Sequence, residues 1–363
     1  MKNLPKIIAF YLPQFHNVIE NNKWWGEGFT EWTTVKNAKK YFKKHNQPII
    51  PGELGYYDLS DNAIIAKQIA LAKKNQIDAF CLYHYWFGNS KVLLEKPAKN
   101  YIEDKSLEYP IMFCWANQSW ERNWYGQKNE VLLRQEYPGE FDVKKHLDYL
   151  APYFNDHRYL KLDEKPIFMI HEIIEVGNTH NYLELYKKNA KEITGKEIYL
   201  MAGYNSRENQ LNNQLEILLP FDAKIGSSFS ESISSINLTL KNRILDKLNL
   251  RKKPLVYQSQ MIVENILLHL KNNPQRIPMI VPNWDNTPRK LEEGFVISPM
   301  STELLKVLFL AAFEVANNNG LPFIFIKSWN EWSEGNYLEP DDEFGDLLLM
   351  NINNSITYAK DML

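Results

Sequence analysis

Short apolar runs recur along the chain, and each is separated from the next by a segment with helical periodicity. We expect strands at 7–11, 77–82, 111–114, 166–170, 197–202, 221–225, 278–281 and 323–326. We expect helices at 61–71, from about 93, and at 141–150, 182–193, 256–270, 303–316 and 347–358. The apolar runs mostly do not alternate with polar residues. This indicates strands buried on both faces, in a parallel sheet covered by helices.

Eight strand–helix units predict a single-domain (β/α)₈ TIM barrel over residues 1–363, with long loops from strand to helix. An open doubly wound sheet is the alternative. The first strand is not followed by the glycine-rich phosphate loop of many such sheets, which favours the barrel. The stretch 227–254, rich in Ser, Asn and Lys, gives no clear pattern.

Polar and aromatic residues gather directly after the expected strands. The pairs are Gln14 and His16, His84 and Trp86, Asn117 and Trp120, His171 and Glu172, Trp284 and Asp285, and Asn330 and Glu331. In a barrel the carboxyl ends of the strands converge on one face, where active sites lie. The pattern therefore predicts a functional site at that face, rather than tryptophans scattered through a core.

Two carboxylates, Glu331 and Glu334, follow the last expected strand. In a continuing strand they would point to opposite faces, but a turn after Trp332, near Gly335, would bring them to one side. A carboxyl pair is the minimum for acid-assisted cleavage of a glycosidic bond, and burial can keep one member protonated. We predict Glu331 and Glu334 to be catalytic. For Glu339, a functional and a purely structural role are equally expected.

Aromatic residues make up 13% of the chain, and many of the ten tryptophans lie after strands. Their flat faces suit the apolar C–H faces of sugars, although any single tryptophan is more often a packing residue. The candidates are Trp25, Trp32, Trp86, Trp115, Trp120, Trp124 and Trp284. As a group they favour a cleft for an oligosaccharide.

Three histidines after strands, His16, His84 and His171, could in principle bind a metal. Their spacing matches no metal-binding motif, so we expect no metal and no cofactor. Arg289 either binds a negative group of a ligand or pairs with Asp285. The residues expected to contact substrate are Tyr11, Gln14, His16, Trp25, Trp32, Tyr83, His84, Trp86, Trp115, Asn117, Gln118, Trp120, His171, Trp284, Asp285, Arg289, Trp329 and Asn330.

The net charge of −2 gives no electrostatic reason to expect nucleic acid or an anionic membrane as a partner. Cys81 and Cys114 lie in apolar runs and are expected to be free thiols in a reducing compartment. No apolar run approaches the roughly 20 residues of a membrane helix. We therefore expect a cytoplasmic protein without a membrane span.

Six motifs, in order along nearly the whole chain, resemble those of the WbsX-type family, which is related to glycoside hydrolase family 99, the endo-α-mannosidases. They are AFYLPQFH (9–16), WGEGFTEW (25–32), YHYWF (83–87), WAN (115–117), WDNTPR (284–289) and WNEWSEG (329–335). The resemblance implies a (β/α)₈ barrel without a metal. Many members carry Glu after the WAN motif, where this chain has Gln118. An amide in that place can hydrogen-bond a hydroxyl but cannot act as a base.

The resemblance also implies roles for the two carboxylates. Glu331 would deprotonate the 2-hydroxyl of the sugar, which then attacks the anomeric carbon to give an epoxide-like intermediate with overall retention. Glu334 would protonate the leaving oxygen and then activate water. Three functions follow as hypotheses: a retaining, endo-acting glycosidase on bacterial polysaccharide or oligosaccharide, a glycosyltransferase of lipopolysaccharide O-antigen or capsule biosynthesis, and a non-catalytic glycan-binding barrel.

Overall fold

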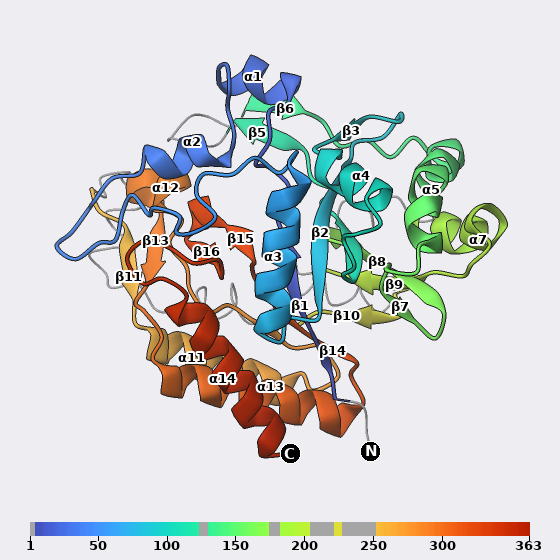
Figure 1. The fold of residues 1–363 in the computed structure, drawn as a ribbon. Helices are drawn as coiled ribbons and strands as arrows, with labels where there is room; N and C mark the ends of the chain where they lie inside the picture. Colours follow the sequence, from blue (N-terminus) through green and yellow to red (C-terminus); the bar gives the residue numbers. More distant parts are fainter. Residues whose placement is uncertain (1–3, 123–129, 174–181, 204–220, 227–251) are drawn as a thin grey trace.

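A parallel sheet of eight strands forms the centre of the protein (Figure 1). The computed structural model describes residues 4–122, 130–173, 182–203, 221–226 and 252–363. In spatial order the strands are β10 (Ala223–Lys224), β9 (Tyr199–Ala202), β8 (Lys165–Ile170), β4 (Ile111–Trp115), β2 (Ala79–Trp86), β1 (Lys6–Tyr11), β14 (Phe323–Ile326) and β12 (Met279–Ile280). Each of the eight expected strands therefore has a counterpart in the sheet.

The two ends of the sheet are joined beside β10 and β12. Ile225 forms a parallel bridge with Ile277. The amide of Ile277 donates to the carbonyl of Lys224 at 2.9 Å, and the amide of Gly226 donates to the carbonyl of Ile277 at 2.8 Å. These bonds close the sheet, and the fold is the expected (β/α)₈ barrel.

Helices cover the outside of the barrel, and shorter elements occupy the loops (Figure 1). The outer helices are α3 (Asn62–Lys74), α4 (Lys96–Glu103), α5 (Glu140–Asn155), α7 (Tyr182–Thr194), α11 (Ser259–Asn272), α13 (Thr302–Asn319) and α14 (Leu347–Asp361). The loop elements are α1 (Ile19–Trp25), α2 (Glu31–Lys36), α12 (Thr287–Lys290), η1 (Leu291–Glu293), η2 (Trp332–Glu334), β3 (Val92–Leu93), β5 (Trp120–Arg122), β6 (Glu130–Leu133), β7 (Lys161–Leu162), β11 (Leu255–Tyr257), β13 (Phe295–Ile297), β15 (Asn330–Glu331) and β16 (Asn336–Tyr337).

Three of the predicted boundaries are wrong because strand pairing extends or replaces the expected element. The strand expected at 77–82 continues as β2 to Trp86, because all eight of its residues are covered on both faces. The helix expected from about 93 begins only at Lys96, after β3 pairs with the end of β2. The helix expected from 256 begins at Ser259, because 255–257 pairs with β13. In each case strand pairing overrides the local pattern.

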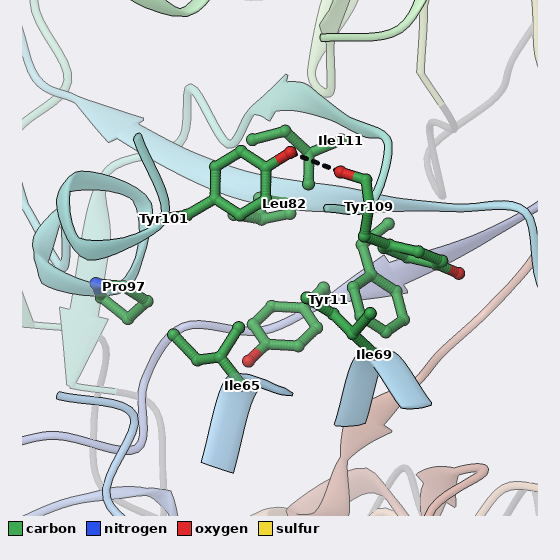
Figure 2. Close-up of a pocket in the computed structure, with 9 residues that line it drawn as sticks. Tyr11, Ile65, Ile69, Leu82, Pro97, Tyr101, Tyr109 and Ile111 are labelled. Carbon is green, nitrogen blue, oxygen red and sulfur yellow. Dashed lines mark hydrogen bonds between the residues drawn. The ribbon is translucent and has the colours of Figure 1, made fainter. Parts of the chain in front are cut away.

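The side chain of Tyr11, expected to contact substrate, points out of the barrel toward α3 (Figure 2). Its hydroxyl donates to Gln68 at 2.7 Å. It lines an apolar cavity of about 20 Å³ together with Ile65, Ile69 and Tyr101. The cavity is large enough for one water, but it lacks the two or more polar partners that an ordered water needs. We interpret it as a packing defect.

Hydrogen bonds to β1 hold the segment that follows β14. The amide of Trp329 donates to the carbonyl of Phe10 at 2.7 Å. The side chain of Asn330 accepts from the amide of Leu12 at 2.7 Å and donates to its carbonyl at 3.0 Å. Asn330, which we expected to contact substrate, is thus a buried residue whose side chain hydrogen-bonds the backbone at the end of the first strand.

Glu339 anchors the same segment from the other side. Its Oε1 accepts from Gln68 at 2.6 Å and from the indole of Trp329 at 2.9 Å. Its Oε2 accepts from Tyr57 at 2.8 Å and from the indole of Trp332 at 2.6 Å. Burial raises the pKa of Glu339 to about 7, although these hydrogen bonds act to lower it. The two tryptophans beside Glu331 are therefore fixed by one buried carboxyl.

Replacing Glu339 with Gln should destabilise the protein, because an amide has one accepting oxygen where the carboxyl offers two. We expect the free energy of unfolding at pH 5 to fall by about 2–4 kcal/mol, measured by urea denaturation. The matched control is Glu343→Gln, at an exposed glutamate four residues away. A Glu339→Gln variant as stable as the control would contradict the anchoring role.

The pH dependence of this effect has a definite sign. The folded-state pKa of about 7 lies above the ordinary value of 4.5, so the folded protein binds this proton more tightly. The resulting stability is fully present below pH 4.5 and is lost as the pH rises through 7. Because Gln does not titrate, the stability difference between wild type and Glu339→Gln should narrow across that window. A difference that stays constant or widens would contradict the raised pKa of Glu339.

Candidate active site

The backbone after β14 makes the turn that brings Glu331 and Glu334 to one side. Glu331 ends β15, and residues 332–334 form a single 3₁₀ turn. Gly335 ends this turn with φ +54°, in the left-handed region that favours glycine. A Cβ at this position would lie 2.7 Å from the Cβ of Asp285. Glycine thus lets the carbonyl of Glu334 accept from the amide of Asp285 at 2.7 Å.

The carboxyl groups of Glu331 and Glu334 face the same cation and lie close enough to influence each other's pKa. The Lys327 ammonium lies 3.5 Å from Oε2 of Glu331 and 3.7 Å from Oε2 of Glu334. Ser328 donates its hydroxyl to Oε1 of Glu331 at 2.8 Å. The exposed fraction of the side chain is 5% for Glu331 and 17% for Glu334. Glu331 is therefore the inner member of the pair and Glu334 the outer one.

The pKa values of Glu331 and Glu334 are shifted in opposite directions. Burial acts to raise the pKa of Glu331, but the Lys327 ammonium and the hydrogen bond with Glu334 bring it below its ordinary value. Burial also raises the pKa of Glu334, and the opposing charges of Arg289 and Lys327 do not cancel this, because the negative charge of Glu331 adds to it. The surroundings therefore push the two pKa values apart, downward for Glu331 and upward for Glu334, which is the division that acid–base chemistry needs.

Arg289 lies between two carboxyl groups. Its Nη1 donates to Oε1 of Glu334 at 2.7 Å, and its Nη2 donates to Oε1 of Glu31 at 2.7 Å. The pairing with Asp285 that we considered is wrong, because Oδ2 of Asp285 binds His45 at 2.8 Å. Gln47 and Thr287 fill the remaining contacts of that carboxylate. Asp285 therefore orders its own loop, and Arg289 belongs to the glutamate pair.

Aromatic side chains border the pair on the inner face of β2. Burial, together with the nearby negative charge of Glu331, raises the pKa of the Tyr83 hydroxyl well above the ordinary value. Tyr85, two residues further along the same face, is near enough to be influenced by the charge of Glu331. Trp120 packs against Tyr85 with ring centroids 5.3 Å apart. Trp120, a candidate sugar-stacking residue, therefore lies next to a tyrosine that borders the glutamate pair.

Two further predicted residues lie at this cluster. Lys327 stands over the ring of Trp284, 5.3 Å from its centroid. His171 meets Tyr83 edge to face at 6.0 Å. Burial, together with the charge of Lys327, lowers the pKa of His171 to about 4, so its imidazole is neutral at pH 7. Such an imidazole can both donate and accept a hydrogen bond.

Three residues expected to contact substrate point away from this cluster. His84 and Trp86 alternate with the inward-facing tyrosines of β2 and so face the outer helices. His84 lies 2.7 Å from His146, and the indole of Trp86 donates to Asp142 at 2.9 Å, both on α5. Trp115 donates its indole hydrogen to the carbonyl of Trp86 at 2.8 Å. These three side chains pack the barrel against α5.

The residues expected on the first loops are mostly packing residues as well. The indole of Trp32 donates to the carbonyl of Tyr57 at 2.7 Å and contacts Trp332 at 5.4 Å. His16 binds the carbonyl of Pro13 at 3.0 Å, and Gln14 is buried. Trp25 is half-buried and stacks on Phe29, and Trp329 packs against Phe80. Trp124 lies outside the described residues.

Asn117 joins the ends of β4 and β8. Its side chain donates to the carbonyl of Glu172 at 2.7 Å and accepts from the amide of Glu172 at 2.7 Å. The neighbouring Gln118 is exposed and donates to the carboxylate of Glu172 at 3.3 Å. Gln118 thus satisfies an adjacent carboxylate without adding charge.

Two charged residues of this cluster were not among the sequence candidates. Lys327 is the first polar residue after the strand 323–326, so the rule that polar residues follow strands would have selected it. Glu31 lies within the motif at 25–32 and is completely buried. A charged residue inside an aromatic motif could have marked Glu31 as a candidate. Its partner could not be identified from the sequence, because Arg289 is 258 residues away.

Within the described part of the chain, no group of three or more His, Cys, Asp or Glu residues is arranged to hold a metal ion. The three histidines considered for this purpose have separate surroundings, as described above. Cys81 and Cys114 are buried free thiols. The described helices include none with the length and apolar character to cross a membrane.

The fold is similar to those of solved glycoside hydrolases. The GH99 endo-α-mannosidase from Bacteroides thetaiotaomicron aligns with a TM-score of 0.57 and 15% identity, over 98% of this chain and 97% of that chain. A structure described as a glycoside hydrolase-like protein aligns with a TM-score of 0.64 and 15% identity, over 98% and 95% of the two chains. At this identity the similarity establishes the fold alone.

Two similar curated proteins, both named uncharacterized protein WxcX, come from strains of Xanthomonas campestris pv. campestris. They are 29% and 28% identical over 362 residues, which is 98% of this chain. The chain spans about half the length of these relatives, 50% in each case. The family described as "Glycosyltransferase WbsX" matches residues 7–352. The chain therefore belongs to the WbsX family.

Proposed function

We propose that this protein is a retaining, endo-acting enzyme of the glycoside hydrolase type, acting on α-mannoside-like linkages of a bacterial polysaccharide or oligosaccharide. The observation that carries the proposal is the placement of Glu331 and Glu334 after β14 around the Lys327 ammonium, with the pKa of Glu331 lowered and that of Glu334 raised. Cleavage of a glycosidic bond uses two carboxyl groups, one protonated to act as the acid and one ionised to act as the base. The cytoplasmic location expected from the sequence is part of this proposal.

In the proposed first step, Glu331 takes the proton of the sugar's 2-hydroxyl. The resulting oxygen attacks the anomeric carbon while the bond to the leaving oxygen breaks, and Glu334 donates its proton to that oxygen. The product is an epoxide-like sugar. Lys327 assists because its positive charge stabilises the ionised form of Glu331, which is the form that accepts a proton.

In the proposed second step, the now ionised Glu334 takes a proton from water. The water oxygen attacks the anomeric carbon and opens the three-membered ring, and Glu331 returns its proton to the 2-oxygen. Two inversions at one carbon give net retention, and both carboxyl groups regain their starting protonation. Tyr83, which contacts Glu331, and Trp284, which carries Lys327 over its ring, would border the sugar at this point.

A second candidate function is glycosyl transfer in surface-polysaccharide assembly, favoured by the family's description as glycosyltransferases. The same two carboxyl groups would then act on a sugar donor, with a hydroxyl of another sugar in place of water. The two functions differ in the donor. Calorimetric titration with nucleotide sugars would give saturable binding for a transferase that uses such donors and none for a hydrolase.

Glu334→Gln should abolish turnover, because the amide can neither protonate the leaving oxygen nor activate water. With a glycan selected from a library by hydrolysis, we expect kcat to fall by at least about 100-fold while the binding constant changes little. Glu314→Gln, at an exposed glutamate of α13, is the control. NMR of the first product formed by wild type tests retention. Activity that survives in both Glu331→Gln and Glu334→Gln would refute the assignment and favour a glycan-binding barrel.

The rate should follow a bell-shaped pH profile. Its acidic limb reports ionisation of Glu331, whose pKa is lowered, and its alkaline limb reports Glu334, whose pKa is raised. Lys327 lowers both values, so Lys327→Met should move both limbs to higher pH. The matched control is Lys306→Met on α13, at a half-buried lysine whose ammonium lies over the ring of Tyr358. A profile for Lys327→Met that coincides with the wild type would exclude this role for the lysine.

A further inference from the structure

Glu31 is a completely buried carboxylate at the first position of α2. Its Oε1 accepts from Arg289 at 2.7 Å, from the amide of Ser333 at 3.3 Å and from the hydroxyl of Ser333. Among the described residues, none donates to its Oε2. Every contact of this carboxylate is thus directed at Arg289 or at the turn that carries Glu334.

Arg289 transmits the charge of Glu31 to the pair. One guanidinium nitrogen binds Glu31 and another binds Glu334, each at 2.7 Å, and Nε donates to Ser333 at 2.5 Å. The exposed fraction of the Arg289 side chain is 15%. The planar fork of an arginine holds such a geometry with little remaining freedom, so the carboxyl of Glu334 is fixed in direction.

The charges around the pair balance when the pair carries one proton. Arg289 and Lys327 are positive, and Glu31 and Glu331 are negative, so the cluster is neutral when Glu334 carries a proton. Without Glu31, an uncompensated guanidinium would lie directly against Glu334. A cation this close lowers the pKa of a carboxyl group by about 1–3 units, which would remove the acid.

We propose that Glu31 is a positioning residue that, acting through Arg289, keeps Glu334 in its protonated form and directs its carboxyl toward Glu331. This rests on the proposed function of Glu334 as the acid. The competing explanation is that Glu31 only ties α2 to the loop after β14, through its contacts with Ser333. The two explanations differ because only the first depends on the charge of Glu31.

The test is a carboxyl titration of the whole protein, which needs no substrate. Glutamate labelled with ¹³C at the carboxyl carbon is followed by NMR from pH 3 to 9, and the signals of Glu331 and Glu334 are assigned with the Glu331→Gln and Glu334→Gln variants. Glu31→Gln should lower the titration midpoint of Glu334 by about one unit or more. Ser333→Ala, which removes a tether and no charge, should leave the midpoint within about 0.3 unit of wild type.

A compensating variant keeps the test decisive if Glu31→Gln does not fold. Glu31→Gln combined with Arg289→Met removes both charges together, so the midpoint of Glu334 should stay near the wild-type value. Arg289→Met alone should raise it. An unchanged midpoint in Glu31→Gln, or no rise in Arg289→Met, would overturn the proposal. Because titration is separate from turnover, failure here is distinguishable from failure of the proposed function, which the activity of Glu334→Gln decides.

Discussion

The site depends on the electrostatic contact between two carboxyl groups that cannot both be ionised at close range. Glu331 and Glu334 lie against each other, with Lys327 over both and Arg289 on the outer one. Each buried charge in such a cluster costs free energy unless a partner offsets it. The two cations and Glu31 set the balance so that one proton remains on Glu334.

This contact requires a backbone that does not move, and the barrel supplies it. The segment after β14 is tied to β1 by Asn330, to α3 by way of Glu339 and Gln68, and to the Asp285 loop by a turn that only glycine permits. These are buried polar contacts, in which an unpaired group is costly. The tertiary structure thus converts a short polar loop into a fixed one, which is what prearranged acid–base groups need.

Membership of the WbsX family and similarity to the GH99 fold limit the chemistry without selecting it. Barrels of this kind support many reactions, because the site depends on a few side chains at the strand ends. Hydrolysis and transfer would use the same pair and differ in the sugar donor and in the oxygen that receives the sugar. The arrangement of Glu331 and Glu334 is compatible with both, and the donor decides between them.

The sequence alone determined the barrel, the eight strands and the position of the glutamate pair. Apolar runs predict buried strands, and the polar residues that follow them predict the strand ends. Both signals come from neighbouring residues and can be read directly from the sequence. The tertiary structure decided which side each residue faces. The sequence did not distinguish His84 and Trp86 from Tyr83. Because β2 continues through Trp86, its side chains alternate, and those of His84 and Trp86 face outward. The tertiary structure also brought Glu31 to Arg289. Ion pairs form between groups that are close in space, and the spacing of residues along the chain does not show which groups those are.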